Sequence, residues 1–183
     1  MILTNKIRYA DKQLFAERVQ EIADNLGIEA DWLMLVMYFE SGLNPTAVNR
    51  TSGATGLIQF MPPTANALGV STERLRQMNA VDQLYYVEKY LLPYKNKMRD
   101  FVDVYLAVFY PSAIGKSDDY VLGGDNYAKV ASQNSIFDTN HDGKITRGEV
   151  ADYYSNWASK VLGQSKNTDS KRGVLPVAVG FFL

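Results

Sequence analysis

The chain has 183 residues and a formal net charge of −1, from 19 lysines and arginines against 20 aspartates and glutamates, which argues against a nucleic-acid-binding protein that works by neutralising phosphates. Cysteine is absent and His141 is the single histidine, which excludes disulfide scaffolds, thiol nucleophiles and cysteine-ligated zinc and disfavours a Ser-His-Asp triad. The chemistry must then come from carboxylates, hydroxyls, amides and aromatic side chains.

Apolar residues at helical spacing predict a mainly α protein, beginning with two helices in the first quarter of the chain. The first carries one apolar face and ends at Gly27; its face comprises Leu14, Phe15, Val19, Ile22 and Leu26. The next run, residues 32–39, is apolar on all sides, which predicts a buried helix that Gly42 and Pro45 end.

The remaining pattern continues the helical class. Residues 49–63 are rich in Gly, Ser and Thr and predict a loop, after which Pro63 opens a short helix. Residues 84–91 and 101–110 predict two further helices, although the second run is also compatible with a strand. A last amphipathic helix is expected from Val150, Tyr154, Trp157 and Val161.

Residues 1–162 are expected to form one domain, followed by a polar linker and an apolar tail over residues 163–183. The tail is too short to span a bilayer, so no transmembrane segment is expected. The first residues lack the apolar core of a secretory signal, so no signal peptide is expected.

Glu40 directly follows the buried run and is the first candidate for chemistry. Partial burial and the negative end of a helix dipole both disfavour a charged carboxylate, so we expect a raised pKa for Glu40. A carboxylic acid that stays protonated near neutral pH is suited to general acid catalysis on a glycosidic oxygen. A solvated glutamate at a helix end is the alternative interpretation.

Two segments around this residue resemble the soluble-type lytic transglycosylases. Residues 40–45 read Glu-Ser-Gly-Leu-Asn-Pro, and residues 53–62 read Gly-Ala-Thr-Gly-Leu-Ile-Gln-Phe-Met-Pro. The family pattern is Glu-Ser-x-x-x-Pro followed by Gly-Ala-x-Gly-Leu-x-Gln and Met-Pro. The resemblance covers residues 33–68 and implies the helical, lysozyme-like fold that this family shares with goose-type lysozymes.

The resemblance also implies a reaction and a set of site residues. Glu40 would protonate the oxygen between N-acetylmuramic acid and N-acetylglucosamine, and would then act as base on the muramic O6 hydroxyl, which closes a 1,6-anhydro ring. Ser41 would orient the substrate or Glu40. The saccharide groove would be lined by Gln59, Phe60 and Met61, since sugars are held by amide and hydroxyl hydrogen bonds and by apolar contact.

The chain departs from the family pattern further downstream. The usual Ala-Tyr-Asn-Ala-Gly segment corresponds to residues 107–113, where the asparagine is missing and Tyr110 lies near its position. Tyr110 is either a substrate-facing hydroxyl or a core aromatic. Most glycosidases use a second carboxylate, but none lies at a matching short spacing. Asp31, Asp82 and Glu88 are candidates that could approach Glu40 in space.

Residues 138–149 match the EF-hand calcium loop at every ligand position. The expected ligands are Asp138, Asn140, Asp142, the carbonyl of Lys144, Thr146 and the bidentate carboxylate of Glu149. No second loop is present for pairing, so we expect Ile145 to pack on the domain itself. The sequence therefore predicts one structural Ca²⁺ and no organic cofactor, with a polar turn as the alternative.

The sequence thus favours a peptidoglycan lytic transglycosylase. The alternatives are a hydrolytic muramidase of the same fold, a non-catalytic peptidoglycan-binding module, and a calcium-binding interaction protein that works through its tail. The absence of a recognisable export signal favours a lysin carried by a phage tail or virion that acts on the periplasmic cell wall of the host. Tail, baseplate or injection-machine proteins are then the expected partners.

Overall fold

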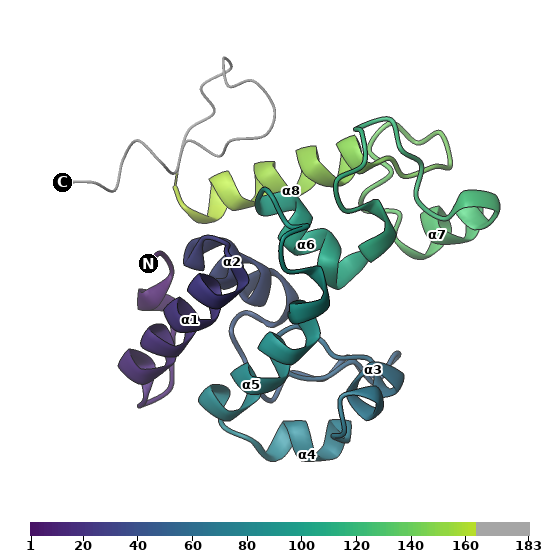
Figure 1. Ribbon diagram of the computed structural model, residues 1–183. Helices are drawn as coiled ribbons and strands as arrows, with labels where there is room; N and C mark the ends of the chain where they lie inside the picture. Colours follow the sequence, from purple (N-terminus) through teal and green to yellow (C-terminus); the bar gives the residue numbers. More distant parts are fainter. Residues whose placement is uncertain (164–183) are drawn as a thin grey trace. The chain divides into compact units, whose positions relative to one another are not determined.

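Figure 1 shows the computed structural model, in which residues 1–163 are described. The described part is mainly helical, and its only β pairing is three isolated bridges, Val48–Thr55, Thr55–Phe60 and Val121–Thr146. The chain divides into two compact units, Met1–Asn96 and Lys97–Leu183. Most of the predicted linker and tail, residues 164–183, lies outside the described residues, and the single domain over residues 1–162 stays a prediction. Among the described helices, none has the length and apolar character needed to cross a membrane.

The first unit is built around α1 (Lys12–Leu26), α2 (Ala30–Ser41) and α5 (Ala80–Leu91), and α1 packs on both of the others. Phe15, Val19 and Ile22 of α1 are fully buried, as predicted. The prediction that Leu14 lies on the buried face of this helix is wrong, because its side chain is 54% exposed. It precedes the buried stripe by one residue, and a helix turns by 100° at each step.

The centre of this unit is α2, and the prediction of a buried helix is confirmed. Five consecutive residues, 33–37, have no exposed surface, so this part of the helix is surrounded by protein on every side. The helix ends at Gly42, whose φ of 66° lies in the left-handed region that glycine adopts without a Cβ clash. The residues that leave the core at this end are Glu40 and Ser41.

Short helices connect α2 to α5. The bridged loop over residues 47–60 is followed by α3 (Pro62–Ala67), which begins one residue before the predicted start, and by α4 (Thr72–Gln77). Ser71 caps α4 and Asn79 caps α5, each by accepting a backbone N–H with its side chain. A 3₁₀ turn, η2 (Leu92–Tyr94), extends α5, and another, η1 (Thr4–Lys6), precedes α1.

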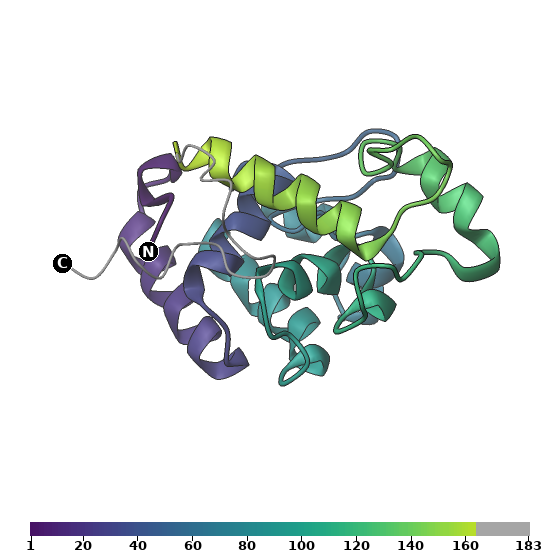
Figure 2. The same ribbon diagram turned by 90° about the horizontal axis from the view of Figure 1, so that it is seen from above.

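The second unit contains α6 (Phe101–Phe109), α7 (Tyr127–Gln133) and α8 (Arg147–Val161), with 3₁₀ turns η3 (Pro111–Ala113) and η4 (Gly124–Asn126). The helix predicted over residues 101–110 is confirmed. Figure 2 shows α8 as one straight helix, and it packs on α6. Aromatic stacking joins the two helices, because Tyr154 of α8 stacks on Phe101 and Tyr105 at centroid distances of 4.4 and 4.1 Å.

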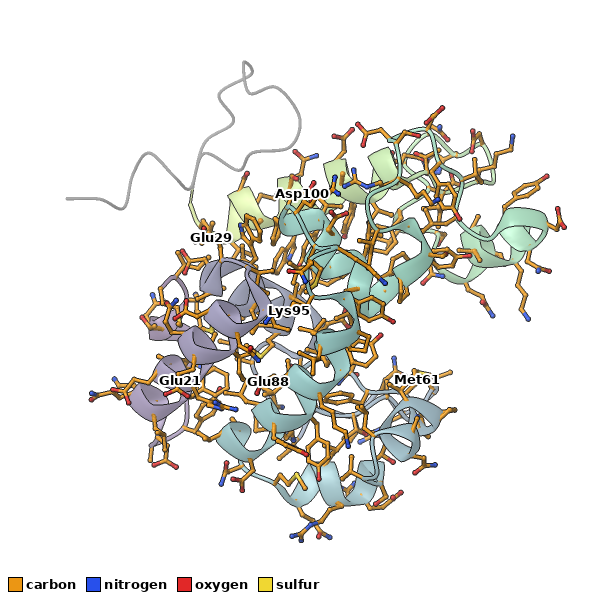
Figure 3. The ribbon with its side chains drawn as sticks, viewed as in Figure 1. Glu21, Glu29, Met61, Glu88, Lys95 and Asp100 are labelled. Carbon is orange, nitrogen blue, oxygen red and sulfur yellow. The ribbon has the colours of Figure 1, made fainter. Side chains whose placement is uncertain are left out.

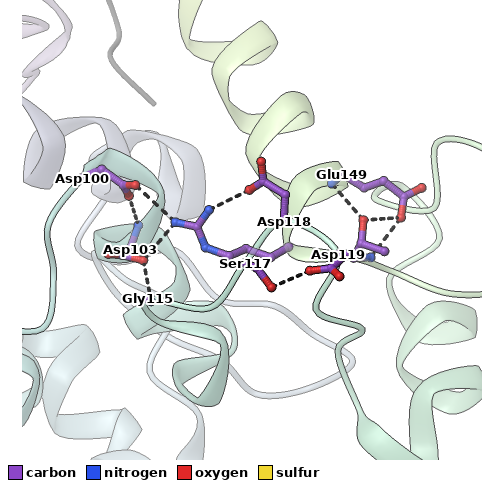
Figure 4. Close-up of polar contacts among 9 residues, drawn as sticks. Asp100, Asp103, Gly115, Ser117, Asp118, Asp119 and Glu149 are labelled. Atoms are coloured by element: carbon purple, nitrogen blue, oxygen red, sulfur yellow. Dashed lines mark hydrogen bonds and ion pairs between the residues drawn. The ribbon is translucent and has the colours of Figure 1, made fainter. Parts of the chain in front are cut away.

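An ionic cluster holds the first turn of α8 within the second unit (Figure 4). The guanidinium of Arg147 donates to Asp100 and Asp103 at 3.2 Å each and to Asp118 at 3.0 Å. Asp103 is only 2% exposed and also accepts the Gly115 N–H, so its charge is compensated on two sides. A buried carboxylate needs such partners, because an unpaired charge in the interior is strongly destabilising. The cluster therefore fixes the start of α8 against α6 and residues 115–118.

Candidate active site

Glu40 lies in the last turn of α2, at the end of the buried run. Its side chain is half-buried, and this burial raises the pKa of the carboxyl from 4.5 to about 7. The cause is desolvation, which penalises the charged form. A group with this pKa is present in both protonation states near neutral pH, so it is able to give a proton and to take one back. The sequence-based expectation of a raised pKa at Glu40 is confirmed.

Tyr90 of α5 is a neighbour of Glu40 that the sequence motifs do not contain. Burial raises the pKa of the Tyr90 phenol to about 12, and the charges of Tyr94 and Glu40 add to this effect. Because the charge of Glu40 contributes to the raised pKa of Tyr90, the two side chains interact electrostatically. Tyr86, Tyr90 and Tyr94 follow each other at four-residue spacing, a helical stripe visible in the sequence.

Ser41 connects the end of α2 to the glycine-containing loop. Its hydroxyl is within hydrogen-bond distance of the carbonyls of Met37, at 3.0 Å, and Leu57, at 2.9 Å, and it accepts the Asn44 N–H at 3.2 Å. These backbone contacts hold the end of α2 against Leu57. The role of Ser41 in orienting the substrate or Glu40 stays a prediction.

Gln83 is a positioning residue that the sequence did not reveal. Its side chain is fully buried, accepts the Leu57 N–H at 3.0 Å, and donates to the carbonyls of Pro45 at 2.6 Å and Leu75 at 2.8 Å. A Cβ on Gly56 would lie 2.5 Å from the Gln83 amide oxygen, and φ at Gly56 is +83°. Gly56 and Leu57, the Gly-Leu pair of the family motif, therefore both lie against the buried amide of Gln83.

The three residues predicted to line the groove differ in exposure. Gln59 has a positive φ of 52°, and its half-buried amide donates to the Gly56 carbonyl at 3.0 Å. Phe60 is 2% exposed and packs edge-on against Tyr90 with a centroid distance of 6.2 Å, so it supports that ring from the core. Met61 is 45% exposed beside α3 (Figure 3). Sugar contacts by Gln59 and Met61 stay predictions.

The acidic residues considered as partners of Glu40 have other contacts. Asp31 accepts the Ile2 N–H at 2.8 Å, and Asp82 is bound to Asn79 in the cap of α5. Glu88 binds Arg18 and Asn25 at 2.7 Å each, on the side of α5 that faces α1 (Figure 3). Within the first unit, none of these three carboxylates is a hydrogen-bonding partner of Glu40.

Tyr110 belongs to the second unit, where its hydroxyl oxygen accepts the Gly123 N–H at 2.8 Å. This bond connects the end of α6 to the glycine pair at residues 123–124. A Cβ on Gly123 would approach the Tyr127 backbone to 2.7 Å, so this turn is closely packed. The contact agrees with a structural role for Tyr110, and contact with a substrate stays a prediction.

The loop over residues 138–149 is closed by its own side chains. Asp138 accepts the N–H groups of Asp142 and Gly143 at 3.1 Å each, and Asn140 accepts the Asp142 N–H at 2.9 Å. Glu149 accepts the Thr139 N–H at 3.1 Å with one oxygen and forms a capping box with Thr146 through the other (Figure 4). In the described part of the chain, no three acidic, histidine or cysteine side chains form a group that could hold a metal ion.

Ile145 anchors this loop to the second unit, as expected from the absence of a paired loop. Its side chain is fully buried, and its carbonyl accepts the Leu122 N–H at 2.8 Å. The adjacent bridge between Val121 and Thr146 makes residues 118–122 the pairing partner of the loop. Each of the six predicted ligand residues offers a side-chain or backbone oxygen atom, which is the ligand type that Ca²⁺ takes.

A half-buried glutamic acid whose pKa lies near neutrality is the kind of group that glycoside-cleaving enzymes use as a general acid. Comparison with known families identifies the chain more closely. Residues 17–108, half of its length, match the family described as Transglycosylase SLT domain. The chain belongs to this family, whose membership points to cleavage of glycosidic bonds in peptidoglycan.

The raised pKa of Glu40 predicts a specific pH dependence of stability. Because the folded-state pKa lies above the unfolded value, ionisation favours the unfolded chain, and stability falls as the pH rises from 4.5 to about 7. Glu40→Gln should match the wild type in denaturant unfolding at pH 4 and exceed it by about 1–3 kcal/mol at pH 8. Glu17→Gln, at an exposed position on α1, is the control and should show no such difference. Equal stability of Glu40→Gln and wild type at pH 8 would contradict the burial of a protonated acid.

Proposed function

We propose that this protein is a lytic transglycosylase that cleaves the β-1,4 bond between N-acetylmuramic acid and N-acetylglucosamine, with Glu40 as its acid and base. The single observation that carries the proposal is the half-buried Glu40 carboxyl, whose pKa is raised to about 7 and which follows the fully buried residues 33–37 of α2. Family membership supplies the substrate class, which is peptidoglycan.

The proposed reaction uses the Glu40 carboxyl group twice, first as an acid and then as a base. In the first step, protonated Glu40 donates to the glycosidic oxygen while the bond from that oxygen to C1 of the muramic residue breaks, and N-acetylglucosamine leaves with a free hydroxyl. The N-acetyl group of the substrate stabilises the positive charge at C1. In the second step, the Glu40 carboxylate removes the proton from the O6 hydroxyl as O6 bonds to C1, which restores the acid and yields the 1,6-anhydro ring.

The surroundings of Glu40 support this cycle. Because burial alone accounts for the raised pKa, the acid needs no neighbouring carboxylate to stay protonated. The Tyr90 phenol, with a pKa of about 12, stays neutral throughout and adds no charge beside the acid. Ser41 and Gln83 fix the end of α2 and residues 56–57, so the carboxyl keeps its position between the two proton transfers.

The alternative is a muramidase that admits water to C1 and releases reducing ends. An inverting or retaining hydrolase places a second carboxylate opposite its acid. In the first unit, Asp31, Asp82 and Glu88 are engaged elsewhere, and this favours the transglycosylase outcome. A non-catalytic peptidoglycan-binding module is disfavoured because binding does not require a desolvated acid.

Product analysis separates these functions. Wild type and Glu40→Gln are incubated with purified peptidoglycan, and the soluble products are identified by mass spectrometry. We expect 1,6-anhydromuramic ends from the wild type and a loss of at least about 100-fold in rate for Glu40→Gln, the usual contribution of a general acid. Glu17→Gln should retain full activity. Reducing-end products would contradict the transglycosylase, and full activity of Glu40→Gln would contradict the role of Glu40.

We further propose that residues 138–149 bind one structural Ca²⁺. The proposal rests on the ligand spacing, on the oxygen donor set, and on backbone bonds that already fold the loop around Asp138. Asp138, Asn140, Asp142, Lys144, Thr146 and Glu149 would hold the ion. Bound calcium would stabilise the folded second unit, in which Ile145 and the Arg147 cluster connect the loop to α6 and residues 118–122.

A thermal melt in excess calcium and in EGTA tests the calcium proposal. Calcium at 100 times its dissociation constant contributes about 2.7 kcal/mol, so the melting temperature should rise by about 5 °C or more. Glu149→Gln keeps a side chain that can complete the capping box but loses the bidentate carboxylate, so its shift should disappear. Asp125→Asn, an exposed aspartate outside the loop, should keep the shift. An unchanged wild-type melting temperature would contradict the proposal.

Delivery by a phage tail, virion or injection machine is a proposal that rests on the sequence alone.

A further inference from the structure

The loop over residues 138–149 pairs with residues 118–122, called the paired segment below. EF-hand loops usually occur in pairs and exchange backbone hydrogen bonds at their eighth position, which here is Ile145. The Ile145 carbonyl accepts the Leu122 N–H at 2.8 Å, and the Arg147 N–H donates to the Tyr120 carbonyl at 2.9 Å. These two bonds flank the antiparallel bridge described above. A segment of the same unit therefore occupies the pairing edge that a second EF-hand loop would use.

The pairing continues into the first turn of α8. The Gly148 N–H donates to the Asp118 carbonyl at 2.9 Å. A Cβ on Gly148 would lie only 3.1 Å from that carbonyl oxygen and 3.2 Å from the Asp118 Cβ, so the two segments approach each other closely. Leu122 and Ile145 have no exposed surface, so both sides of the pairing are anchored in the core of the second unit.

Arg147 fastens the same turn through its side chain. It is the tenth residue of the loop and lies in the sequence between two predicted ligands, Thr146 and Glu149. Its guanidinium is 10% exposed and bonds one aspartate of the paired segment and two aspartates of α6, the N-cap residue Asp100 and Asp103 in the first turn. Figure 4 shows Glu149 well apart from Asp100 and Asp103. The turn is thus held from the side away from the Glu149 carboxylate.

The first half of the loop has fewer anchors. Phe137, the residue before the loop, is 3% exposed and packs on Phe109 with a centroid distance of 4.9 Å. Residues 139–144 are exposed, and Asp138 accepts its hydrogen bonds from within the loop. The loop therefore has an exposed first half and a second half, residues 145–149, that the rest of the unit fixes.

This asymmetry affects how an ion is bound. A site whose binding-competent form is only partly populated shows a dissociation constant raised by the inverse of that fraction. Fixing part of a site before binding removes part of the ordering cost. Thr146 and Glu149 both belong to the fixed half, where their capping box defines the position of one Glu149 oxygen. The contacts of Arg147 and the paired segment therefore favour the binding-competent form.

We infer that Arg147 and the paired segment replace the missing second EF-hand loop and hold Thr146 and Glu149 in position for calcium. Arg147 is a positioning residue, which raises the calcium affinity without contacting the ion. Calcium then orders the exposed half of the loop and leaves the first turn of α8 in place, so the site is a clamp and does not switch the position of the helix. The inference rests on the calcium site proposed above.

The calcium affinity of Arg147 variants tests the inference, because charge and positioning predict opposite signs. If Coulomb repulsion alone mattered, removal of a positive charge beside the loop would tighten calcium binding. The inference predicts weaker binding: the Kd of Arg147→Met, measured by competition with a chelator, should rise about tenfold, as for a turn that is formed about a tenth of the time. Arg147→Lys keeps the charge without the planar guanidinium and should give an intermediate value. An unchanged or lower Kd in Arg147→Met would overturn the inference.

Milder variants keep the test decisive if Arg147→Met does not fold. Asp118→Asn weakens one partly exposed ion pair of the guanidinium and should raise the Kd about two- to fivefold. Asp119→Asn removes the same charge from an exposed neighbour that bonds Ser117, and should leave the Kd unchanged. Equal effects of these two variants would overturn the inference, because they would indicate long-range charge alone.

A further control separates positioning from general stability. Trp157→Leu removes a stacking contact within α8, away from the loop, so it should lower the melting temperature and leave the Kd unchanged. A Kd raised in Trp157→Leu as much as in Arg147→Met would overturn the inference, because loss of stability would then explain both results.

Hydrogen exchange in EGTA distinguishes this inference from the calcium proposal. In the wild type, the amides of Leu122, Arg147 and Gly148 should be protected more strongly than those of residues 139–144, and Arg147→Met should lower their protection by about tenfold or more. Unprotected amides at these three positions would overturn the inference even if calcium binds. Protection of these amides in a wild type that binds no calcium would support the role of Arg147 in fixing the turn and contradict the calcium proposal.

Discussion

The complete burial of residues 33–37, in the middle of α2, is the constraint on which the rest of the first unit depends. A helix that is apolar around its whole circumference is stable only when other elements enclose it, and residues 33–37 are enclosed on all sides. The helix must still end, and its last turn brings Glu40 from the core to the surface. Desolvation at that boundary keeps part of the carboxyl population protonated near neutral pH. The same packing that stabilises the unit therefore produces the acid.

A second constraint is the position of the loop that faces the end of α2. Gln83 uses its buried amide to bind the Leu57 N–H and two carbonyls, and Gly56 leaves the space that this amide occupies. Ser41 makes the corresponding contact from α2 to Leu57. The glycine and the serine of the motif thus contribute to the position of this loop, and the proposed chemistry depends on Glu40. Two successive proton transfers with the same bound substrate require that the acid and the neighbouring loop keep their positions.

Local patterns in the sequence predicted much of this arrangement. The buried run, the end of its helix at Gly42 and the helix over residues 101–110 each depend on residues that are neighbours in the chain, and all three predictions were correct. Leu14 was predicted to lie on the buried face and is exposed, because the spacing of apolar residues does not define where the buried face of a helix ends. Gln83 and Tyr90 were missed because their importance comes from tertiary contacts. Gln83, for example, binds Leu57, which is 26 residues away along the chain. The tyrosine stripe at residues 86, 90 and 94 was visible, but its proximity to Glu40 was not.

The central claim is that the Glu40 carboxyl is the acid and that burial sets its pKa near neutrality. The most direct measurement combines two titrations: the carboxyl carbon of Glu40 followed by NMR, and kcat/KM on peptidoglycan measured over the same pH range. The account predicts that Glu40 titrates at about pH 7 and that kcat/KM falls above this pH with the same midpoint, because the free enzyme then lacks its proton. A Glu40 midpoint near 4.5, with the loss of activity at an unrelated pH, would contradict it.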